Sequence, residues 1–191
     1  LACAKNGIIW SSCSPDFGTP GLIERFSQIK PKILILTDRY YYNGKEISIL
    51  ERLPSIIHKI KSIKYVLIFS YPGKKLVKIS NFKKINIFTK KNIVPSKNKI
   101  FKYEKFDFND DLAILYSSGT TGKPKCICHR LGGVLLQHLK EHKLHCEIKP
   151  GDNIFYFTTC GWMMWNWLVS ALASEASIVL FDGFPMHKNC L

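Results

Sequence analysis

The chain has 191 residues, a formal net charge of +14 and an apolar content of 46%. This length and composition are typical of a globular protein with a core, and they exclude a disordered chain. Seven cysteines, an odd number without compact disulfide spacing, indicate a reducing compartment, the cytosol.

Strand and helix patterns alternate along the first seventy residues. The predicted elements are, in order, a strand at 8–10, a helix over 18–28, a strand over 32–37, a helix over 47–60 and a strand over 64–70. Pro31 ends the first helix, and Pro54 restarts or kinks the second. Because the run at 32–37 is continuously apolar, we expect this strand to be covered on both faces.

Residues 72–108 are weakly periodic and rich in lysine. Fourteen lysines but only one acidic residue, Glu104, occur between Lys59 and Lys105. This charge also suits a nucleic-acid surface, but the stretch has no arginine and no recognisable nucleic-acid motif. We therefore expect a solvated, variable loop region with short strands and no nucleic-acid partner.

The second half continues the alternation. The predicted elements are a strand over 111–116, a second strand over 125–129, a helix over 131–146, a strand over 153–158, a helix over 162–173 and a strand over 177–181. One face of the first helix carries Leu131, Val134, Leu135, His138, Leu139 and His142. The helix over 162–173 has about twelve residues, where about twenty span a bilayer, so we expect no membrane span. The whole pattern predicts an α/β fold with a mostly parallel sheet flanked by helices.

Residues 116–125 read Tyr-Ser-Ser-Gly-Thr-Thr-Gly-Lys-Pro-Lys and join two predicted strands. The glycines allow successive N–H groups to converge on an anion, and the hydroxyls and lysines add donors and charge. The segment is not a Walker A loop, because only two threonines separate its glycines and proline follows its first lysine. A plain polar hairpin turn is the alternative, but it needs no such density of hydroxyls and lysines. We predict a strand–loop–strand hairpin that binds a polyphosphate, with ATP as the first candidate.

This loop resembles the phosphate loop of the adenylate-forming superfamily. Further segments narrow the resemblance to the acetoacetyl-CoA synthetase family; they are 9–18, 42–45, 132–141, 144–146, 149–152, 157–159 and 161–166. The resemblance implies that residues 1–191 are part of the large N-terminal AMP-binding domain, truncated at both ends. It also implies that the small C-terminal domain, with its catalytic lysine, lies outside this chain, so that residues 1–191 alone are inactive.

The resemblance further implies a two-step reaction with acetoacetate, ATP, Mg²⁺ and coenzyme A. The acid attacks the α-phosphate of ATP, and the thiol of coenzyme A then displaces AMP to give acetoacetyl-CoA. The phosphate-binding residues implied are Ser117, Ser118, Gly119, Thr120, Thr121, Gly122, Lys123 and Lys125. Cys126 stands where the superfamily usually has glycine, although a small residue also occurs in the acetoacetyl branch. Two alternatives stay open: another short-chain acyl-CoA synthetase, such as one for acetate, and a truncated protein that binds nucleotide without catalysis.

The predicted helix over 162–173 begins with tryptophans and methionines. Within the resemblance, Trp162, Met163 and Trp165 are candidates for the wall of a small acyl pocket. Core packing is the alternative for this stripe, and it applies most to Trp165 and Trp167.

Two other groups of residues are weaker candidates. The segment 11–18 lies between a strand and a helix, where Ser14 or Asp16 caps the helix or the turn approaches coenzyme A. A zinc site is the alternative reading of the cysteines and histidines at Cys126, Cys128, His129, His138, His142, His145 and Cys146. Their spacing matches no standard zinc module, so we predict no bound structural metal. The oligomeric state is left open.

Overall fold

The computed structural model describes residues 1–79, 82, 85–93, 104–117 and 122–183. The chain divides into two compact units. The first contains Leu1–Ser14 and Ile100–Phe181, and the second contains Pro15–Lys99 and Asp182–Leu191. None of the helices in the described part of the chain combines the length and the apolar character needed to cross a bilayer.

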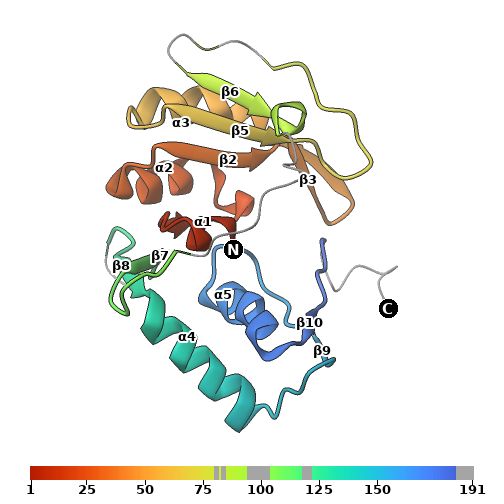
Figure 1. Cartoon of the computed structure of the whole chain (residues 1–191). Coiled ribbons are helices and arrows are strands. Elements are labelled where there is room, and N and C mark those ends of the chain that lie inside the picture. Colours follow the sequence, from red (N-terminus) through yellow and green to blue (C-terminus); the bar gives the residue numbers. More distant parts are fainter. Residues whose placement is uncertain (80–81, 83–84, 94–103, 118–121, 184–191) are drawn as a thin grey trace. The chain divides into compact units, whose positions relative to one another are not determined.

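The second unit is built on a parallel sheet of three strands in the order β2-β5-β6. These strands are Ile33–Thr37, Tyr65–Phe69 and Asn86–Thr89. Helices α2 (Gly18–Ile29) and α3 (Leu53–Lys59) contact each other and lie alongside this sheet (Figure 1). The core of the unit is aliphatic and contains Leu22, Leu34, Ile49, Leu53, Ile56, Ile60, Ile63, Val66 and Ile68.

The expectation that the strand over 32–37 is covered on both faces is wrong for the described residues. Leu34 is buried, but Ile33 is 50% exposed and Ile35 is also exposed. Tyr65 on β5 and Phe88 on β6 are exposed as well. Because side chains alternate between the faces of a sheet, one face packs into the core and the other stays open within this unit.

A β-hairpin follows β2. Strands β3 (Arg39–Tyr42) and β4 (Lys45–Ser48) pair antiparallel. Asn43 and Gly44 form the turn, with φ of 47° and 74°. Positive φ at both central residues defines a type I′ turn, which asparagine and glycine tolerate best.

The ends of the helices in this unit differ from the predicted ones. The helix expected over 47–60 is a 3₁₀ turn, η2 (Leu50–Arg52), followed by α3, and Pro54 lies in the first turn of α3. Proline is favoured there because the first N–H groups of a helix have no intrahelical acceptor. A 3₁₀ turn, η1 (Pro15–Phe17), precedes α2, and η3 (Lys90–Asn92) follows β6.

The expectation that Ser14 or Asp16 caps α2 is wrong. Phe17 occupies the N-cap position, and no side chain caps the helix. Asp16 lies within the η1 turn and Ser14 precedes that turn, and α2 begins at Gly18.

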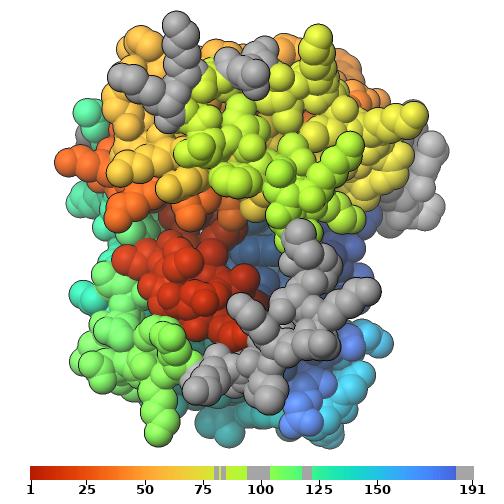
Figure 2. All heavy atoms as spheres, turned by 45° about the horizontal axis from the view of Figure 1, so that its top comes forward, coloured from red at the N-terminus to blue at the C-terminus, as the bar shows by residue number. Residues whose placement is uncertain are grey.

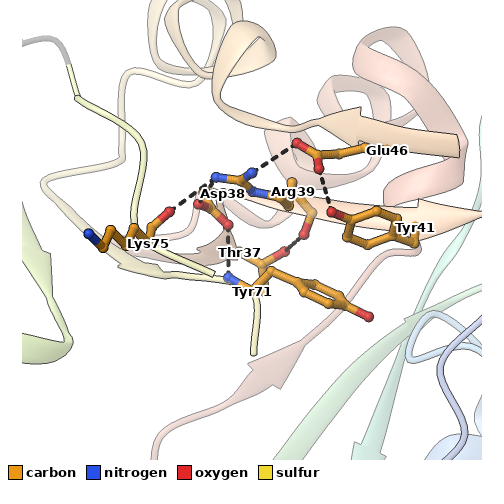
Figure 3. A network of polar contacts seen from close by, with 7 residues as sticks. All are labelled: Thr37, Asp38, Arg39, Tyr41, Glu46, Tyr71 and Lys75. Atoms are coloured by element: carbon orange, nitrogen blue, oxygen red, sulfur yellow. Dashed lines mark hydrogen bonds and ion pairs between the residues drawn. The ribbon is translucent and has the colours of Figure 1, made fainter. Parts of the chain in front are cut away.

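A polar network surrounds Asp38, directly after β2 (Figure 3). Asp38 is 1% exposed, and its carboxylate accepts from the N–H of Tyr71 at 2.9 Å and from the guanidinium of Arg39 at 3.0 Å. Arg39 also donates to Glu46 at 2.9 Å and to the carbonyl of Lys75 at 3.2 Å. Burial by itself raises the pKa of Asp38, but the bonds from Arg39 and Tyr71 outweigh it and lower the pKa.

The first unit contains two small sheets. In one, β1 (Trp10–Ser11) runs parallel to β7 (Asp111–Tyr116), which pairs antiparallel with β8 (Cys126–Arg130). In the other, β9 (Asn153–Ile154) runs parallel to β10 (Ser177–Ile178). The predicted strand–loop–strand hairpin and the mostly parallel pairing are therefore confirmed.

Five helical segments complete the described part of this unit. They are α1 (Ala2–Lys5), α4 (Leu131–Lys140), the π-helical turn η4 (Glu141–His145), α5 (Met163–Ser170) and the 3₁₀ turn η5 (Ala171–Ser174). Helix α1 has no buried residue and lies at the surface (red in Figure 2). The core contains Ala113, Leu115, Ile148, Trp167, Leu168, Ala171 and Ala176.

Several elements of the first unit are shorter than expected. The helix over 131–146 keeps α geometry only to Lys140, and its buried residues are His138 and His142 whereas Leu135 is exposed. The strands expected over 153–158 and 177–181 are two residues each. The helix expected over 162–173 ends at Ser170, and η5 begins at Ala171.

Candidate functional site

The hairpin of β7 and β8 closes the base of the glycine-rich segment. Tyr116 pairs with Cys126, and the N–H of Ser117 donates to the carbonyl of Lys125 at 3.0 Å. Ser117 and Lys125 are eight positions apart in the sequence. Four of the predicted phosphate-binding residues, Ser118, Gly119, Thr120 and Thr121, lie outside the described residues.

Three of the predicted phosphate-binding residues are exposed to solvent. Gly122, Lys123 and Lys125 are exposed, while Pro124 is buried. A Cβ added at Gly122 would meet nothing within 4 Å, so the backbone here borders open space. Two exposed lysine side chains thus follow a glycine whose backbone a ligand can approach.

Two thiols lie on β8 next to this segment. Burial raises the pKa of Cys126, and burial together with Asp111 raises the pKa of Cys128. Both thiols stay protonated at neutral pH and add no negative charge beside the two lysines.

Ser11 fixes the strand that leads into the hairpin loop. Its hydroxyl donates to the carbonyl of Ile114 at 2.8 Å and lies 3.0 Å from the hydroxyl of Tyr116. Ser11 also pairs with Ile114 in the parallel β1–β7 ladder. The end of β7 is therefore held by both backbone and side-chain contacts from β1.

The next residues of the same segment contact the turn that precedes α5. The hydroxyl of Ser12, which is buried, donates to the carbonyl of Cys160. The thiol of Cys160 donates to the carbonyl of Cys13 at 3.6 Å. A Cβ added at Gly161 would lie only 2.8 Å from the backbone nitrogen of Ser14, so the two backbones are in close contact.

The start of α5 is exposed and its later part is buried. Trp162, the N-cap residue, is 54% exposed and Met163 is 46% exposed. Trp165 is half-buried, whereas Trp167 is 9% exposed and belongs to the core. Trp162 and Met163 thus have surface for a ligand, and Trp167 packs the helix in place.

Sequence reasoning missed the bridging role of segment 11–14. It joins the end of β7, through Ser11, to the turn before Trp162, through Ser12 and the close approach at Gly161. The only signal in the sequence was a run of small residues, Ser-Ser-Cys-Ser, after a strand. Such a run permits close backbone approach but does not identify the partner, which lies 148 positions away for Ser12.

The zinc alternative has no support in the described part of the chain. There, no group of three or more His, Cys, Asp or Glu side chains is arranged to hold a metal ion. His138 and His142 are buried in the first unit, whereas His145 is exposed.

Comparisons with known proteins identify the family to which the chain belongs. The family model of the AMP-binding enzymes matches residues 1–191, and the chain belongs to this family. Within it, the chain is 46% identical over 190 residues to an acetoacetyl-CoA synthetase of Gallus gallus and 45% identical to an acetoacetyl-coenzyme A synthetase of Rhizobium meliloti. These alignments cover 97% of this chain and 28% of each relative. A malonamoyl-CoA synthetase of Penicillium aethiopicum is 38% identical, over 98% of this chain and 26% of that protein.

A solved structure gives the same result for the fold. The chain is similar to an acetoacetyl-CoA synthetase from Streptomyces lividans, with a TM-score of 0.86 and 37% identity. The match covers 96% of this chain and 27% of that one. It confirms the expected fold class, part of the N-terminal domain of an adenylate-forming enzyme. The chain thus spans little more than a quarter of the length of its relatives.

Proposed function

We propose that these residues are part of the N-terminal adenylation domain of a cytosolic acetoacetate–CoA ligase. The enzyme activates acetoacetate with ATP to an acyl-adenylate and transfers the acyl group to coenzyme A. The products are acetoacetyl-CoA, AMP and pyrophosphate. The observation that carries this proposal is the closed β7–β8 hairpin, whose glycine, hydroxyl and lysine segment lies in a chain 46% identical to an acetoacetyl-CoA synthetase.

In this proposal the hairpin segment binds the β- and γ-phosphates of ATP. The binding residues are Ser117, Ser118, Gly119, Thr120, Thr121, Gly122, Lys123 and Lys125. Exposure of both lysines supports the assignment, because their ammonium groups can offset charge that develops on the departing pyrophosphate. Magnesium, when bound, takes oxygen ligands and neutralises phosphate charge, and ATP itself supplies most of those oxygens. The serine and threonine hydroxyls of the segment can donate hydrogen bonds to the phosphate oxygens or offer oxygen ligands to the ion.

The acid is bound, in this proposal, at the exposed start of α5. Trp162, Met163 and Trp165 form the wall of the acyl pocket in this proposal, and the exposure of Trp162 and Met163 supports it; large side chains in such a wall favour a short acid. The relatives support the substrate class. Acetoacetate and malonamate are both short carboxylates with a carbonyl on the third carbon, and relatives named for each resemble this chain.

The test uses the longer enzyme that contains these residues. We expect pyrophosphate release that depends on acetoacetate, followed by acetoacetyl-CoA formation that depends on coenzyme A. Residues 1–191 alone serve as the control, and they should form no product. Failure of the longer enzyme to bind ATP would contradict the proposal, and a preference for acetate over acetoacetate would favour the short-chain alternative.

A second experiment examines the acyl pocket. Trp162→Ala and Met163→Ala enlarge the proposed pocket, so we expect each variant to gain activity toward longer acids relative to acetoacetate. Leu144→Ala is the matched control, because Leu144 is an exposed apolar residue on the η4 turn. An unchanged order of acid preference in both pocket variants would remove these residues from the acyl site.

A further inference from the structure

Two histidines are buried in the first unit and have no part in the proposed phosphate or acyl contacts. His138 is 6% exposed and His142 is not exposed at all. Both lie on the side of α4 and η4 that contacts α5 and η5. Burying an imidazole is unfavourable unless its polar atoms are used, so their partners on α5 are informative.

His138 is connected to the backbone of α5 through a serine. Its Nδ1 lies 2.7 Å from the hydroxyl oxygen of Ser170, and that hydroxyl donates to the carbonyl of Trp167 at 2.8 Å. A serine hydroxyl has one proton to donate. With that proton directed at Trp167, the bond between His138 and Ser170 requires a proton on Nδ1.

The protonation state agrees with this geometry. Burial first, and then the neighbouring His142, lower the pKa of His138. The imidazole is therefore neutral at physiological pH and is held as the Nδ1–H tautomer. The hydrogen-bond chain runs from His138 to Ser170 to the carbonyl of Trp167.

His142 contacts the same part of α5 by its ring. The rings of His142 and Trp167 meet edge to face, with centroids 4.5 Å apart and an interplanar angle of 67°. Neither ring nitrogen of His142 has a hydrogen-bond partner of good geometry among the described residues. The backbone of Trp167 nevertheless interacts with the imidazole and opposes the lowering of the His142 pKa by burial, so His142, in the π-helical turn, contacts both the ring and the backbone of Trp167.

We propose that His138, acting through Ser170, is a positioning residue that sets the placement of α5 and thereby of Trp162 and Met163 for the acid. This inference rests on the proposed function. Helix α5 has eight residues, and at about 1.5 Å per residue Met163 and Ser170 are roughly 10 Å apart along its axis. A helix of two turns moves as one body, so a change at Ser170 is transmitted to its start.

The first test is spectroscopic and independent of activity. In ¹⁵N-labelled protein, the imidazole correlations of His138 should show the Nδ1–H tautomer, and Ser170→Ala should abolish that preference. His145, which is exposed, serves as the internal comparison. A His138 ring found as the Nε2–H tautomer in the unsubstituted protein would overturn the proposal.

The second test is kinetic and uses the longer enzyme. His138→Leu and Ser170→Ala should each raise KM for acetoacetate about fivefold, the effect of one net hydrogen bond, without changing KM for ATP. His138→Asn keeps an N–H near the position of Nδ1 and should restore KM for acetoacetate to within about twofold. His145→Leu is the control on the same helical segment and should have no effect.

The outcomes separate the two proposals. An unsubstituted enzyme without acid-dependent turnover contradicts the proposed function. Normal turnover with an unchanged KM for acetoacetate in Ser170→Ala contradicts the positioning role alone. Equal increases in both KM values, without restoration by asparagine, indicate general loss of structure and also overturn the positioning role.

Discussion

Gly161 packs against the backbone of Ser14 so closely that a single added carbon has no space. That carbon would lie 2.8 Å from the Ser14 nitrogen and 3.5 Å from two backbone atoms of Cys13. Both contacts are to main chain, which cannot rotate away as a flexible side chain does. Gly161 therefore allows the turn before α5 to lie directly against segment 11–14.

Gly161→Ala should destabilise the protein by about 1–3 kcal/mol, the range for inserting a carbon into a well-packed region. The free energy of unfolding in urea measures this. Gly133→Ala is the matched control, because Gly133 lies within α4 and a Cβ there meets nothing within 4 Å. The control should be neutral or more stable by up to about 1 kcal/mol. Equal effects of the two substitutions would contradict the close contact.

Removing the charge of Lys123 or Lys125 should weaken ATP binding. A hydrogen bond to a charged group contributes about 1.5–3 kcal/mol, so KM for ATP should rise roughly 10- to 100-fold in Lys123→Ala or Lys125→Ala of the longer enzyme. Lys140→Ala, at the end of α4, removes an exposed lysine elsewhere and should change little. If both loop variants keep the KM for ATP of the parent enzyme, the phosphate assignment is wrong.

Removing the carboxylate of Asp38 should destabilise the second unit strongly. Asp38→Ala leaves the Tyr71 N–H and the Arg39 guanidinium without their shared acceptor, at a cost of about 3 kcal/mol, the lower end for a broken buried ion pair. Glu46→Ala removes the other carboxylate bound to Arg39, but its side chain is 47% exposed and screened by water, so the loss of stability should be clearly smaller than in Asp38→Ala. Urea unfolding compares the two, and a larger loss in the glutamate variant would contradict this account.

Stability should fall as the pH is lowered below the usual histidine pKa of 6.5. Burial lowers the pKa of both His138 and His142, so the unfolded chain takes up protons before the folded one does. The contribution is fully present above pH 6.5 and is lost as the pH falls toward the lowered values. The charged or titratable groups that act on this pair are Glu141, Lys143 and His129.

Unfolding free energies at several pH values between 7.5 and 5 measure this dependence. The double variant His138→Asn with His142→Phe removes both imidazoles and should show a much flatter profile. If the unfolding free energy of the double variant falls with pH as steeply as that of the parent protein, groups other than these two histidines cause the acid sensitivity.

The sequence was most informative where local pattern and local chemistry coincide. The glycine, hydroxyl and lysine segment was predicted as a hairpin between two strands, and β7 and β8 confirm it. The helix over 18–28 and the strand over 64–70 are found within one or two residues. In these cases the apolar periodicity and the proline or glycine signals agree with the tertiary structure.

Three features of the structure differ from the predictions or are absent from them: the β3–β4 hairpin, the open face of β2 and the contact between Ser12 and Cys160. The β3–β4 hairpin is not among the predicted elements, although Asn43-Gly44 is a strong hairpin signal. The open face of β2 was not predictable from its apolar run, because a continuous run does not say how many faces have partners. Nor was the contact of Ser12 with Cys160, which requires chain folding over 148 positions.

Ser11 and Ser12 hold different parts of the candidate site, yet one planar peptide unit joins them. In the proposed function, the residue that supports the nucleotide hairpin and the residue that supports the turn before the acid site are therefore neighbours in the chain. Thermodynamic reciprocity then requires that whatever occupancy by one substrate does to the affinity of the other, the reverse effect has equal size.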